Sequence, residues 1–214
     1  MHTWQGPLAW YTHYIFPHIM DWSLRQPPFQ RERYIALLPA YGNVLEVGFG
    51  TGLNLPHYPA IVTSLTVVDP YPVLPKRVAQ RLAETHMPVT RLDISAVRLP
   101  FANATFDCVV TTWTLCTIPA VVRALHEMRR VLKSHGRYVF LEHGRSTSAR
   151  VAWWQDLCNP LQRCMAGGCN LNRPIGQLIG QAGFEITTLE RFLMPGLPRL
   201  FSKMFRGVAR PAQP

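Results

Sequence analysis

Three glycines spaced two apart, Gly48, Gly50 and Gly52, follow a short apolar segment, and their spacing indicates chemistry. Glycine has no Cβ, so the backbone can turn tightly there and approach a bound ligand closely. A strand that runs into such a loop, with a helix behind it, directs backbone N–H groups at the ligand. Residues 44–52 therefore predict a cofactor cradle.

The spacing of these glycines distinguishes two classes of cofactor. A dinucleotide site uses Gly-x-Gly-x-x-Gly, whose third glycine lets the helix pack on the strand. Here the pattern is Gly-x-Gly-x-Gly, with Glu46 just before it, and this favours S-adenosylmethionine. Asp69 follows about twenty residues later. Its carboxylate could accept hydrogen bonds from both hydroxyls of a ribose, or it could simply begin the turn at Asp-Pro.

The strands and helices that position these residues are indicated by alternating patterns in the sequence. From residue 43 onward they predict a parallel sheet with helices on both faces. We expect strands at 43–47, 64–69, 89–92, 106–111, 137–142, after Gly183 and at 201–209, and helices at 72–84, 119–132, 149–161 and 174–181. We find no internal repeat or linker, so residues 1–214 are predicted to form one domain. Its parts would be an N-terminal helical lid (1–40), a cofactor-binding core (41–145) and a substrate-side portion (146–214).

Two helical pieces divided by Gln26-Pro27-Pro28 are expected within residues 8–38. The first carries aromatic side chains close to helical spacing: Trp10, Tyr11, Tyr14, Phe16 and Trp22. These aromatics fit three interpretations. They could pack the helix on the domain, form a lid over a small substrate, or rest on a membrane interface.

The composition is that of a globular α/β protein, with 48% hydrophobic and 16% charged residues in 214. No apolar run is long enough for a membrane span, and the N-terminus lacks the layout of a secretory signal. The formal net charge is +10, but the basic residues are scattered. We therefore expect no nucleic-acid partner, and we leave open a peripheral contact with an anionic membrane surface.

Five cysteines occur, an odd number without a Cys-x-x-Cys pair, which favours a reduced intracellular compartment and a cytoplasmic location. Cys158, Cys164 and Cys169 lie close in sequence, with His143 upstream, so a soft-metal or arsenic site is one interpretation. Their spacing matches no zinc template, however. Core or loop cysteines are favoured, and no metal is predicted.

The order of the motifs resembles the class I S-adenosylmethionine-dependent methyltransferases, in the group that includes the ubiquinone-biosynthesis enzymes. The matching stretches are VLEVGFGTG (44–52), VDP (68–70), LD (92–93), LPF (99–101), FDCVV (106–110) and RVLKSHG (130–136). Residues 114–119, 140–144 and 168–173 further resemble the thiol methyltransferases of the endoplasmic reticulum and their bacterial relatives. The resemblance implies a Rossmann-like fold with a mostly parallel seven-stranded sheet, helices on both faces and an N-terminal helical lid.

The same resemblance implies S-adenosyl-L-methionine as the cofactor. The predicted cofactor-binding residues are Glu46, Gly48, Gly50, Gly52, Asn54, Asp69, Pro70, Asp93, Ile94, Thr112 and Trp113. Among them, Asp93 could accept a hydrogen bond from the adenine amino group. Trp113 could shield the sulfonium through a cation–π contact.

Methyl transfer is an in-line displacement, so the enzyme must mainly align nucleophile, methyl group and sulfur. A thiol with a pKa of about 8.5 already needs little help to ionise. His143, at the carboxyl end of a strand, could act as a base, orient the acceptor, or serve only a structural hydrogen bond. Tyr11 and Tyr14 are predicted to close the pocket. Cys116 is expected to line it or to pack in the core, since direct transfer needs no enzyme nucleophile.

These observations favour a methyltransferase acting on a small soft nucleophile, a thiol or sulfide. One alternative is methylation of a lipid amine or quinone precursor at a membrane surface, suggested by the aromatic N-terminal helix and by Arg199, Lys203 and Arg206. Another is a non-catalytic module that only binds the cofactor.

Overall fold

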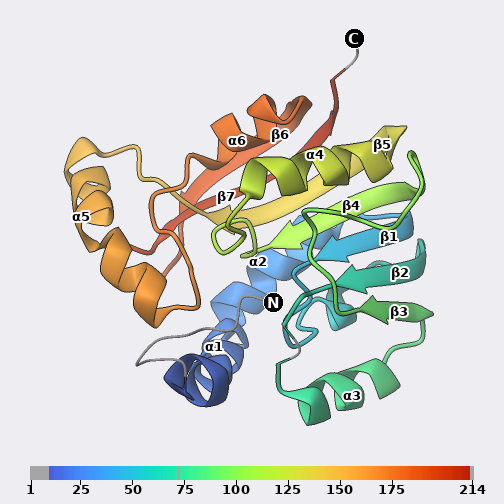
Figure 1. The fold of residues 1–214 in the computed structure, drawn as a ribbon, viewed down its shortest axis with the longest axis horizontal. Helices are drawn as coiled ribbons and strands as arrows, with labels where there is room; N and C mark the ends of the chain where they lie inside the picture. The colour runs from blue at the N-terminus through green and yellow to red at the C-terminus, as the bar shows by residue number, and fades with distance from the viewer. Residues whose placement is uncertain (1–9, 72, 213–214) are drawn as a thin grey trace.

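The computed structural model describes residues 10–71 and 73–212 (Figure 1). Its strands form one seven-stranded sheet in the order β3-β2-β1-β4-β5-β7-β6. They are β1 (Gly42–Val47), β2 (Val62–Val68), β3 (Val89–Leu92), β4 (Phe106–Thr112), β5 (Leu132–His143), β6 (Phe184–Leu193) and β7 (Lys203–Pro211). Strands β1 to β5 pair in parallel, whereas β7 is antiparallel to both β5 and β6. The predicted mostly parallel seven-stranded sheet is confirmed.

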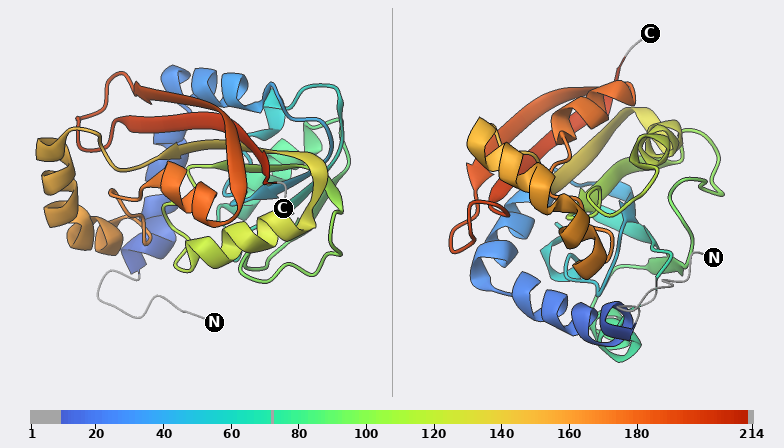
Figure 2. Two further views of the ribbon diagram at one scale, coloured as in Figure 1. Left: turned by 90° about the horizontal axis from the view of Figure 1, so that it is seen from above. Right: turned by 60° about the vertical axis from the view of Figure 1, so that its left-hand side comes forward.

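Helices cover both faces of this sheet. They are the π-helical turn η1 (Tyr11–Ile15), α1 (Phe16–Leu24), α2 (Pro27–Leu37), the 3₁₀ turn η2 (Leu55–His57), α3 (Pro75–Ala83), α4 (Val121–Val131), α5 (Ala149–Met165) and α6 (Ile175–Gln181). Figure 2 shows α4 and α6 on one side of the sheet and α2 on the other. The two helical pieces expected before residue 38 are present, and the break lies at Gln26, just before α2.

Alternate side chains of the central strands enter two separate apolar clusters. Leu45 and Val47 of β1 pack in the cluster that α4 and α6 cover. Val44 of β1 packs in the second cluster, which lies between the sheet and α2. Because successive side chains of a strand point to opposite faces, a strand buried on both sides needs apolar residues at every position. This explains the continuous apolar runs in the sequence.

The helix expected directly behind the glycine loop does not form. The chain makes only the short turn η2 before β2 begins. Pro59 favours an extended conformation of Tyr58 and cannot donate a helical hydrogen bond, so an α-helix does not continue through this segment. The N–H groups that face the cradle therefore come from the loop itself.

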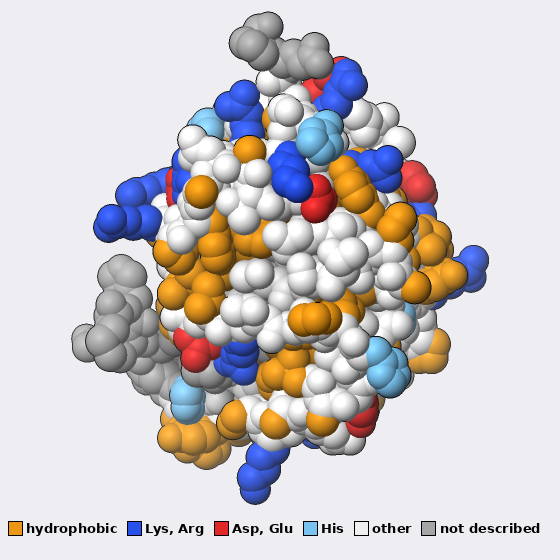
Figure 3. All heavy atoms as spheres, turned by 90° about the vertical axis from the view of Figure 1, so that its right-hand side faces the viewer, with side chains coloured by type: hydrophobic (Ala, Val, Ile, Leu, Met, Phe, Trp, Pro, Cys, Tyr) orange, Lys and Arg blue, Asp and Glu red, His pale blue; other side chains and the backbone are white. Residues whose placement is uncertain are grey.

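Strand β5 begins earlier than predicted, because Leu132 pairs with Phe106 directly after α4. The carboxyl ends of β1 to β4 point to the left in Figure 1, where α1 and α5 also lie. Figure 3 shows the opposite face, at the amino ends of these strands, where Lys and Arg side chains are spread out rather than gathered in one patch. Ligands in open α/β sheets bind beyond the carboxyl ends of the strands.

Candidate active site

The glycine loop is packed tightly at one glycine and open at the next. Gly48, Gly50 and Gly52 have φ values of 82°, 55° and 80°, in the left-handed region that favours glycine. A Cβ on Gly48 would lie 2.1 Å from Thr114 Oγ1, whereas a Cβ on Gly50 would meet nothing within 4 Å. The loop thus rests against the β4 turn at Gly48 and borders free space at Gly50, as a ligand cradle requires.

Asp69 is fixed beside this loop. Its Oδ2 accepts the Gly50 N–H at 2.9 Å, and its Oδ1 accepts the Tyr71 N–H at 3.0 Å. A carboxylate has about four acceptor positions, so two remain for a ligand. Burial raises the pKa of Asp69, an effect that the two N–H groups oppose.

The end of β3 lies beside Asp69, because the Asp69 N–H donates to the carbonyl of Leu92 at 3.2 Å. Asp93 follows directly, is 55% exposed at its side chain, and pairs with Arg91 at 3.1 Å. Ile94 is half-buried and Pro70 is exposed. The predicted ribose and adenine acceptors are therefore neighbours at one edge of the sheet, and their roles stay predictions.

A buried polar chain connects Glu46 to helix α2. Asn54 Nδ2 donates to Glu46 Oε1 at 2.9 Å, and Tyr58 donates to Glu46 Oε2 at 2.7 Å. Arg33 Nη1 donates to Asn54 Oδ1 at 2.6 Å and to Thr112 Oγ1 at 3.1 Å. The chain joins three of the predicted cofactor-binding residues to a helix that the sequence analysis had assigned only to the lid.

Arg33 is the main site residue that sequence reasoning missed. Its only sequence signal is its position: it lies four residues after Phe29 and four before Leu37, so it shares their buried helix face. Arg33 is 4% exposed. A charge is seldom buried unless it is paired, and this one is held within the Glu46 chain.

Trp113 follows β4 with an unusual backbone. Its φ of 51° is left-handed, which costs a bulky residue about 1–3 kcal/mol and is typical of functional sites. The Arg33 guanidinium lies 4.6 Å from its ring centroid, and the Phe29 ring 5.5 Å away. Arg33 is thus its cation partner in this structure. Arg33 Nε and Trp113 Nε1 are buried donors without a partner among the described residues, which suits a ligand that brings an acceptor, such as a carboxylate.

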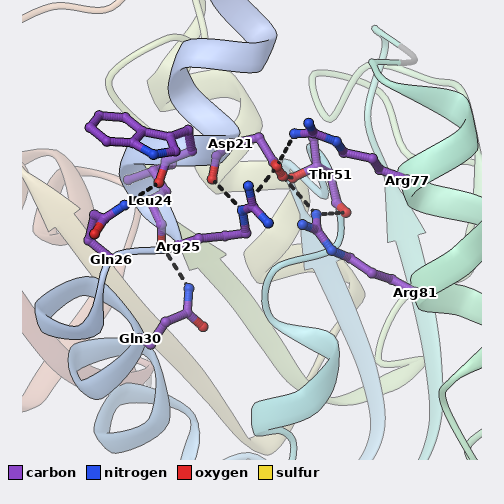
Figure 4. A network of polar contacts seen from close by, with 9 residues as sticks. Asp21, Leu24, Arg25, Gln26, Gln30, Thr51, Arg77 and Arg81 are labelled. Atoms are coloured by element: carbon purple, nitrogen blue, oxygen red, sulfur yellow. Dashed lines mark hydrogen bonds and ion pairs between the residues drawn. The ribbon is translucent and has the colours of Figure 1, made fainter.

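Asp21 of α1 anchors the N-terminal helices to the cradle (Figure 4). It accepts hydrogen bonds from Thr51 Oγ1 at 2.6 Å and Arg81 at 2.8 Å, and it also pairs with Arg77 and Arg25. Arg81 in turn donates to the Thr51 carbonyl at 2.6 Å. The middle of the glycine loop is therefore held by α1 and α3 together.

Asp21→Asn is expected to lower the free energy of unfolding at pH 7 by about 2 kcal/mol, because it removes a buried charge that several arginines share. Burial raises the pKa of Asp21, but hydrogen bonds from Arg81 and Thr51 outweigh it and hold this pKa below its ordinary value. This stability is present above the unfolded-state pKa and is lost as the pH falls through the folded-state pKa. Urea unfolding at pH 7 and at pH 3 measures the difference between wild type and variant.

Asp156→Asn is the matched control for Asp21→Asn, because its ion pair with Arg145 is exposed on both sides, at 45% and 40%. Exposed ion pairs contribute little to stability. An Asp21→Asn protein as stable as the Asp156→Asn protein at pH 7 would contradict the anchoring role.

His143 lies at the carboxyl end of β5 beside two cysteines. Its Nε2 is 3.1 Å from Cys169 Sγ. Cys116, His143 and Cys169 have their ligand atoms all within 4.8 Å of one another. Hydrogen bonding from Cys116 lowers the pKa of Cys169 below its usual range, and His143 adds to this effect, while burial opposes it. Cys116 is buried, as expected.

The predicted lid tyrosines, Tyr11 and Tyr14, both lie on η1. Tyr14 is 59% exposed, and its ring contacts those of Trp10 and His13. Tyr11 is half-buried, with its ring centroid 6.1 Å from that of Phe16. Their predicted role in closing the pocket stays a prediction.

Fold and site together define a class I methyltransferase. Residues 45–140 match the family model described as a methyltransferase domain. The chain is 28% identical over 195 residues to human thiol S-methyltransferase TMT1A, covering 87% of this chain and 80% of that protein. It is 32% identical over 151 residues to thiol S-methyltransferase TMT1B of Rattus norvegicus, covering 69% of this chain and 62% of that protein.

A solved structure matches the fold. It is the 1,6-didemethyltoxoflavin-N1-methyltransferase of Burkholderia thailandensis with bound S-adenosylhomocysteine, at a TM-score of 0.68 and 16% identity, covering 92% of this chain and 84% of that chain. The chain has the class I fold, and the sequence matches identify it as an S-adenosylmethionine-dependent methyltransferase. Its cofactor is S-adenosylmethionine, and the open space at Gly50 and the unpartnered donors near Glu46 fit that molecule. When bound, the cofactor supplies an electrophilic methyl group.

Binding of S-adenosylhomocysteine is expected to strengthen about tenfold between pH 6 and pH 8. Burial raises the pKa of Glu46 to about 7, although Tyr58 and Arg33 partly oppose this. A carboxyl group with a raised pKa is protonated below that value, and the ammonium group of the ligand favours the carboxylate, so affinity rises as the pH passes 7. Calorimetry at both pH values measures the change. A Glu46→Gln variant should show a flat profile, and a variant that keeps the tenfold rise would contradict the assignment to Glu46.

Proposed function

We propose that the protein is a thiol S-methyltransferase that uses S-adenosylmethionine to methylate small alkyl thiols or sulfide. The observation that carries the proposal is that His143, the predicted base at the carboxyl end of β5, is already held by another side chain. His143 is engaged with Cys169. The neighbouring Glu142 is buried, and its Oε2 accepts the N–H groups of Thr114 and Leu115 at 2.9 and 3.1 Å.

A thiol suits such a site better than other acceptors. Thiols ionise near pH 8.5, so an appreciable fraction is thiolate without assistance. Phenols and enolates need a positioned base to become nucleophilic. The thiolate would attack the methyl carbon as the carbon–sulfonium bond breaks, yielding a methyl thioether and S-adenosylhomocysteine. The similarity to two proteins named thiol S-methyltransferases supports the same acceptor class.

The test is a product assay with labelled S-adenosylmethionine and four classes of acceptor: sulfide, alkyl thiols, quinols and aminolipids. We expect methylated product from sulfide or alkyl thiols alone. Product only from quinols or aminolipids would overturn the thiol assignment. Tight binding of S-adenosylhomocysteine without product from any acceptor would instead favour the non-catalytic module.

A second candidate is methylation of a lipid-borne acceptor, favoured by an exposed apolar surface on α1 and α5. Of the residues of α5, only Ala152 and Gln155 are buried. The exposed apolar side chains of the surface are Ile19 and Trp22 on α1, and Trp153, Trp154, Leu157, Leu161 and Met165 on α5. The turn after α5 contacts the start of α1, where a Cβ on Gly167 would lie 3.3 Å from the Phe16 ring.

This surface has the character of an interfacial membrane contact. Tryptophan is enriched at the interface between membrane and water, and an amphipathic helix binds there through its apolar face. Arg150 and Arg163 add exposed positive charge on α5. Among the described residues, no helix has both the length and the apolarity needed to span a bilayer. Any attachment through α1 and α5 would therefore be peripheral.

Sedimentation with anionic vesicles at low salt tests the membrane candidate. We expect binding that a Trp153→Ser, Trp154→Ser double variant weakens at least tenfold. The matched control is Tyr34→Ser, since Tyr34 is 54% exposed but lies on α2. No binding of the wild type, or equal binding of the double variant, would exclude the surface as a membrane contact.

A further inference from the structure

We propose that Cys116, His143 and Cys169 form a binding site for a single Zn²⁺ ion. These side chains come from three separate segments: the turn after β4, the end of β5 and the loop between α5 and α6. Their ligand atoms all lie within 4.8 Å of one another. In a tetrahedral zinc site with bonds of 2.0–2.3 Å, neighbouring ligand atoms are about 3.5–3.8 Å apart, so the ion would require only small side-chain movements.

The type of donor selects the metal. Two sulfurs and an imidazole suit a borderline-soft ion, whereas Mg²⁺ and Ca²⁺ require oxygen ligands. No carboxylate oxygen belongs to the cluster. Glu142 Oε1, on the residue before His143, is buried and has no hydrogen-bond partner among the described residues. Positive charge in the cluster would compensate for the burial of this oxygen.

The segments that carry the cysteines are fixed by contacts that do not involve sulfur. The Asn170 backbone N–H and Nδ2 donate to the Cys116 carbonyl at 3.0 and 2.8 Å. Arg173 Nη2 donates to the carbonyl of Ile118 at 2.7 Å, and Nη1 donates to that of Leu115. Asn159 Oδ1 accepts the Leu171 N–H at 2.8 Å. The donors are therefore preorganised, which lowers the cost of binding an ion.

Three protein ligands leave a fourth position on zinc, as in catalytic rather than structural zinc sites. The cluster lies next to the cradle, because Thr114, two residues before Cys116, donates to the Gly48 carbonyl at 3.5 Å. In a second step of the proposal, the fourth position would bind the sulfur of the acceptor thiol. This step rests on the proposed thiol methylation. An acceptor thiol bound there would release its proton to solvent and keep the electron pair that attacks the methyl carbon.

The test uses the full chain, reduced and stripped of metal, with Co²⁺ as the spectroscopic probe and neither cofactor nor acceptor present. We expect one Co²⁺ per chain, with the intense near-ultraviolet absorption of thiolate ligation, and displacement by Zn²⁺. Cys169→Ser should weaken binding by on the order of 100-fold. Cys164→Ser, which alters an exposed cysteine near the end of α5, is the matched control and should bind as the wild type does.

A second variant, Cys116→Ala, removes another proposed ligand and keeps the test valid if Cys169→Ser does not fold. Circular dichroism verifies that each variant is folded. Absence of thiolate-to-cobalt absorption, or unchanged affinity in both variants, would overturn the zinc site. Because no methyl transfer is measured, these outcomes are independent of the proposed function. Adding an alkyl thiol to the Co²⁺ protein tests the second step: a shifted spectrum supports acceptor ligation, and an unchanged spectrum overturns it.

Discussion

Gly50→Ala is expected to leave the protein folded but to weaken binding of S-adenosylhomocysteine by about 100-fold or more, equivalent to about 2.7 kcal/mol. The new methyl group would meet no protein atom within 4 Å, so no steric clash opposes it. At a φ of 55° a non-glycine residue costs about 1–2 kcal/mol of stability. The methyl group would instead occupy the free space that the cradle offers to the cofactor. Calorimetry with S-adenosylhomocysteine, alongside a thermal melt, measures both effects.

Gly48→Ala is the matched comparison, because it places the same methyl group two residues earlier in the same loop. There the Cβ would lie 2.1 Å from Thr114 Oγ1 and 2.7 Å from Thr114 Cβ. Thr114 is buried and its backbone N–H is bound to Glu142, so it cannot move freely. We expect a loss of about 3 kcal/mol or more in stability. If Gly50→Ala lost stability as Gly48→Ala does, or bound the ligand normally, the cradle assignment would be wrong.

Asp69→Ala is expected to reduce affinity for S-adenosylhomocysteine by at least about 100-fold. Two hydrogen bonds from ribose hydroxyls to a charged acceptor contribute about 1.5–3 kcal/mol each. The variant also releases the Gly50 N–H, which the Asp69 carboxylate holds at 2.9 Å. Both effects act on the cofactor side of the loop, and calorimetry on the folded variant measures their sum.

Asp93→Ala is the comparison for Asp69→Ala, since Asp93 lies at the neighbouring strand end but is half exposed and pairs with Arg91. We expect a smaller loss there, about tenfold, because a solvated acceptor contributes less than a partly buried one. Unchanged affinity in Asp69→Ala would show that Asp69 does not bind the ribose hydroxyls. A larger loss in Asp93→Ala than in Asp69→Ala would place the adenosine elsewhere along the edge.

The sequence was sufficient for the sheet and for the cradle, because both depend on local patterns. Apolar runs such as 106–111 favour strands buried on two faces, and this run forms β4. The left-handed φ at Gly48 and Gly50 is a demand that few other residues meet. The helix expected behind the loop fails for a local reason as well, because Pro59 favours an extended Tyr58 and the helical turn ends at His57.

The polar chains around the cradle could not be predicted from the sequence. Arg33 and Thr112 are 79 positions apart in the chain, and Asp21 and Arg81 are 60 apart. A single arginine or aspartate in a helix carries no signal of its partner, because either side chain is as acceptable in water as in a paired, buried site. Only the packing of α1, α2 and α3 around the loop removes them from water and makes pairing necessary.

The cysteines show the same limit most clearly. Sequence spacing grouped Cys158, Cys164 and Cys169 with His143, whereas the structure places Cys116, together with His143, beside Cys169. His143 and Cys169 are 26 positions apart and meet because β5 ends opposite the loop after α5. The sequence by itself determined the sheet and the conformation of the glycine loop, since strand runs and glycine backbones are specified residue by residue, and the order of its motifs indicated the methyltransferase class. The tertiary structure alone decided which charges and sulfurs surround that cradle, because those contacts exist only when distant segments are packed together.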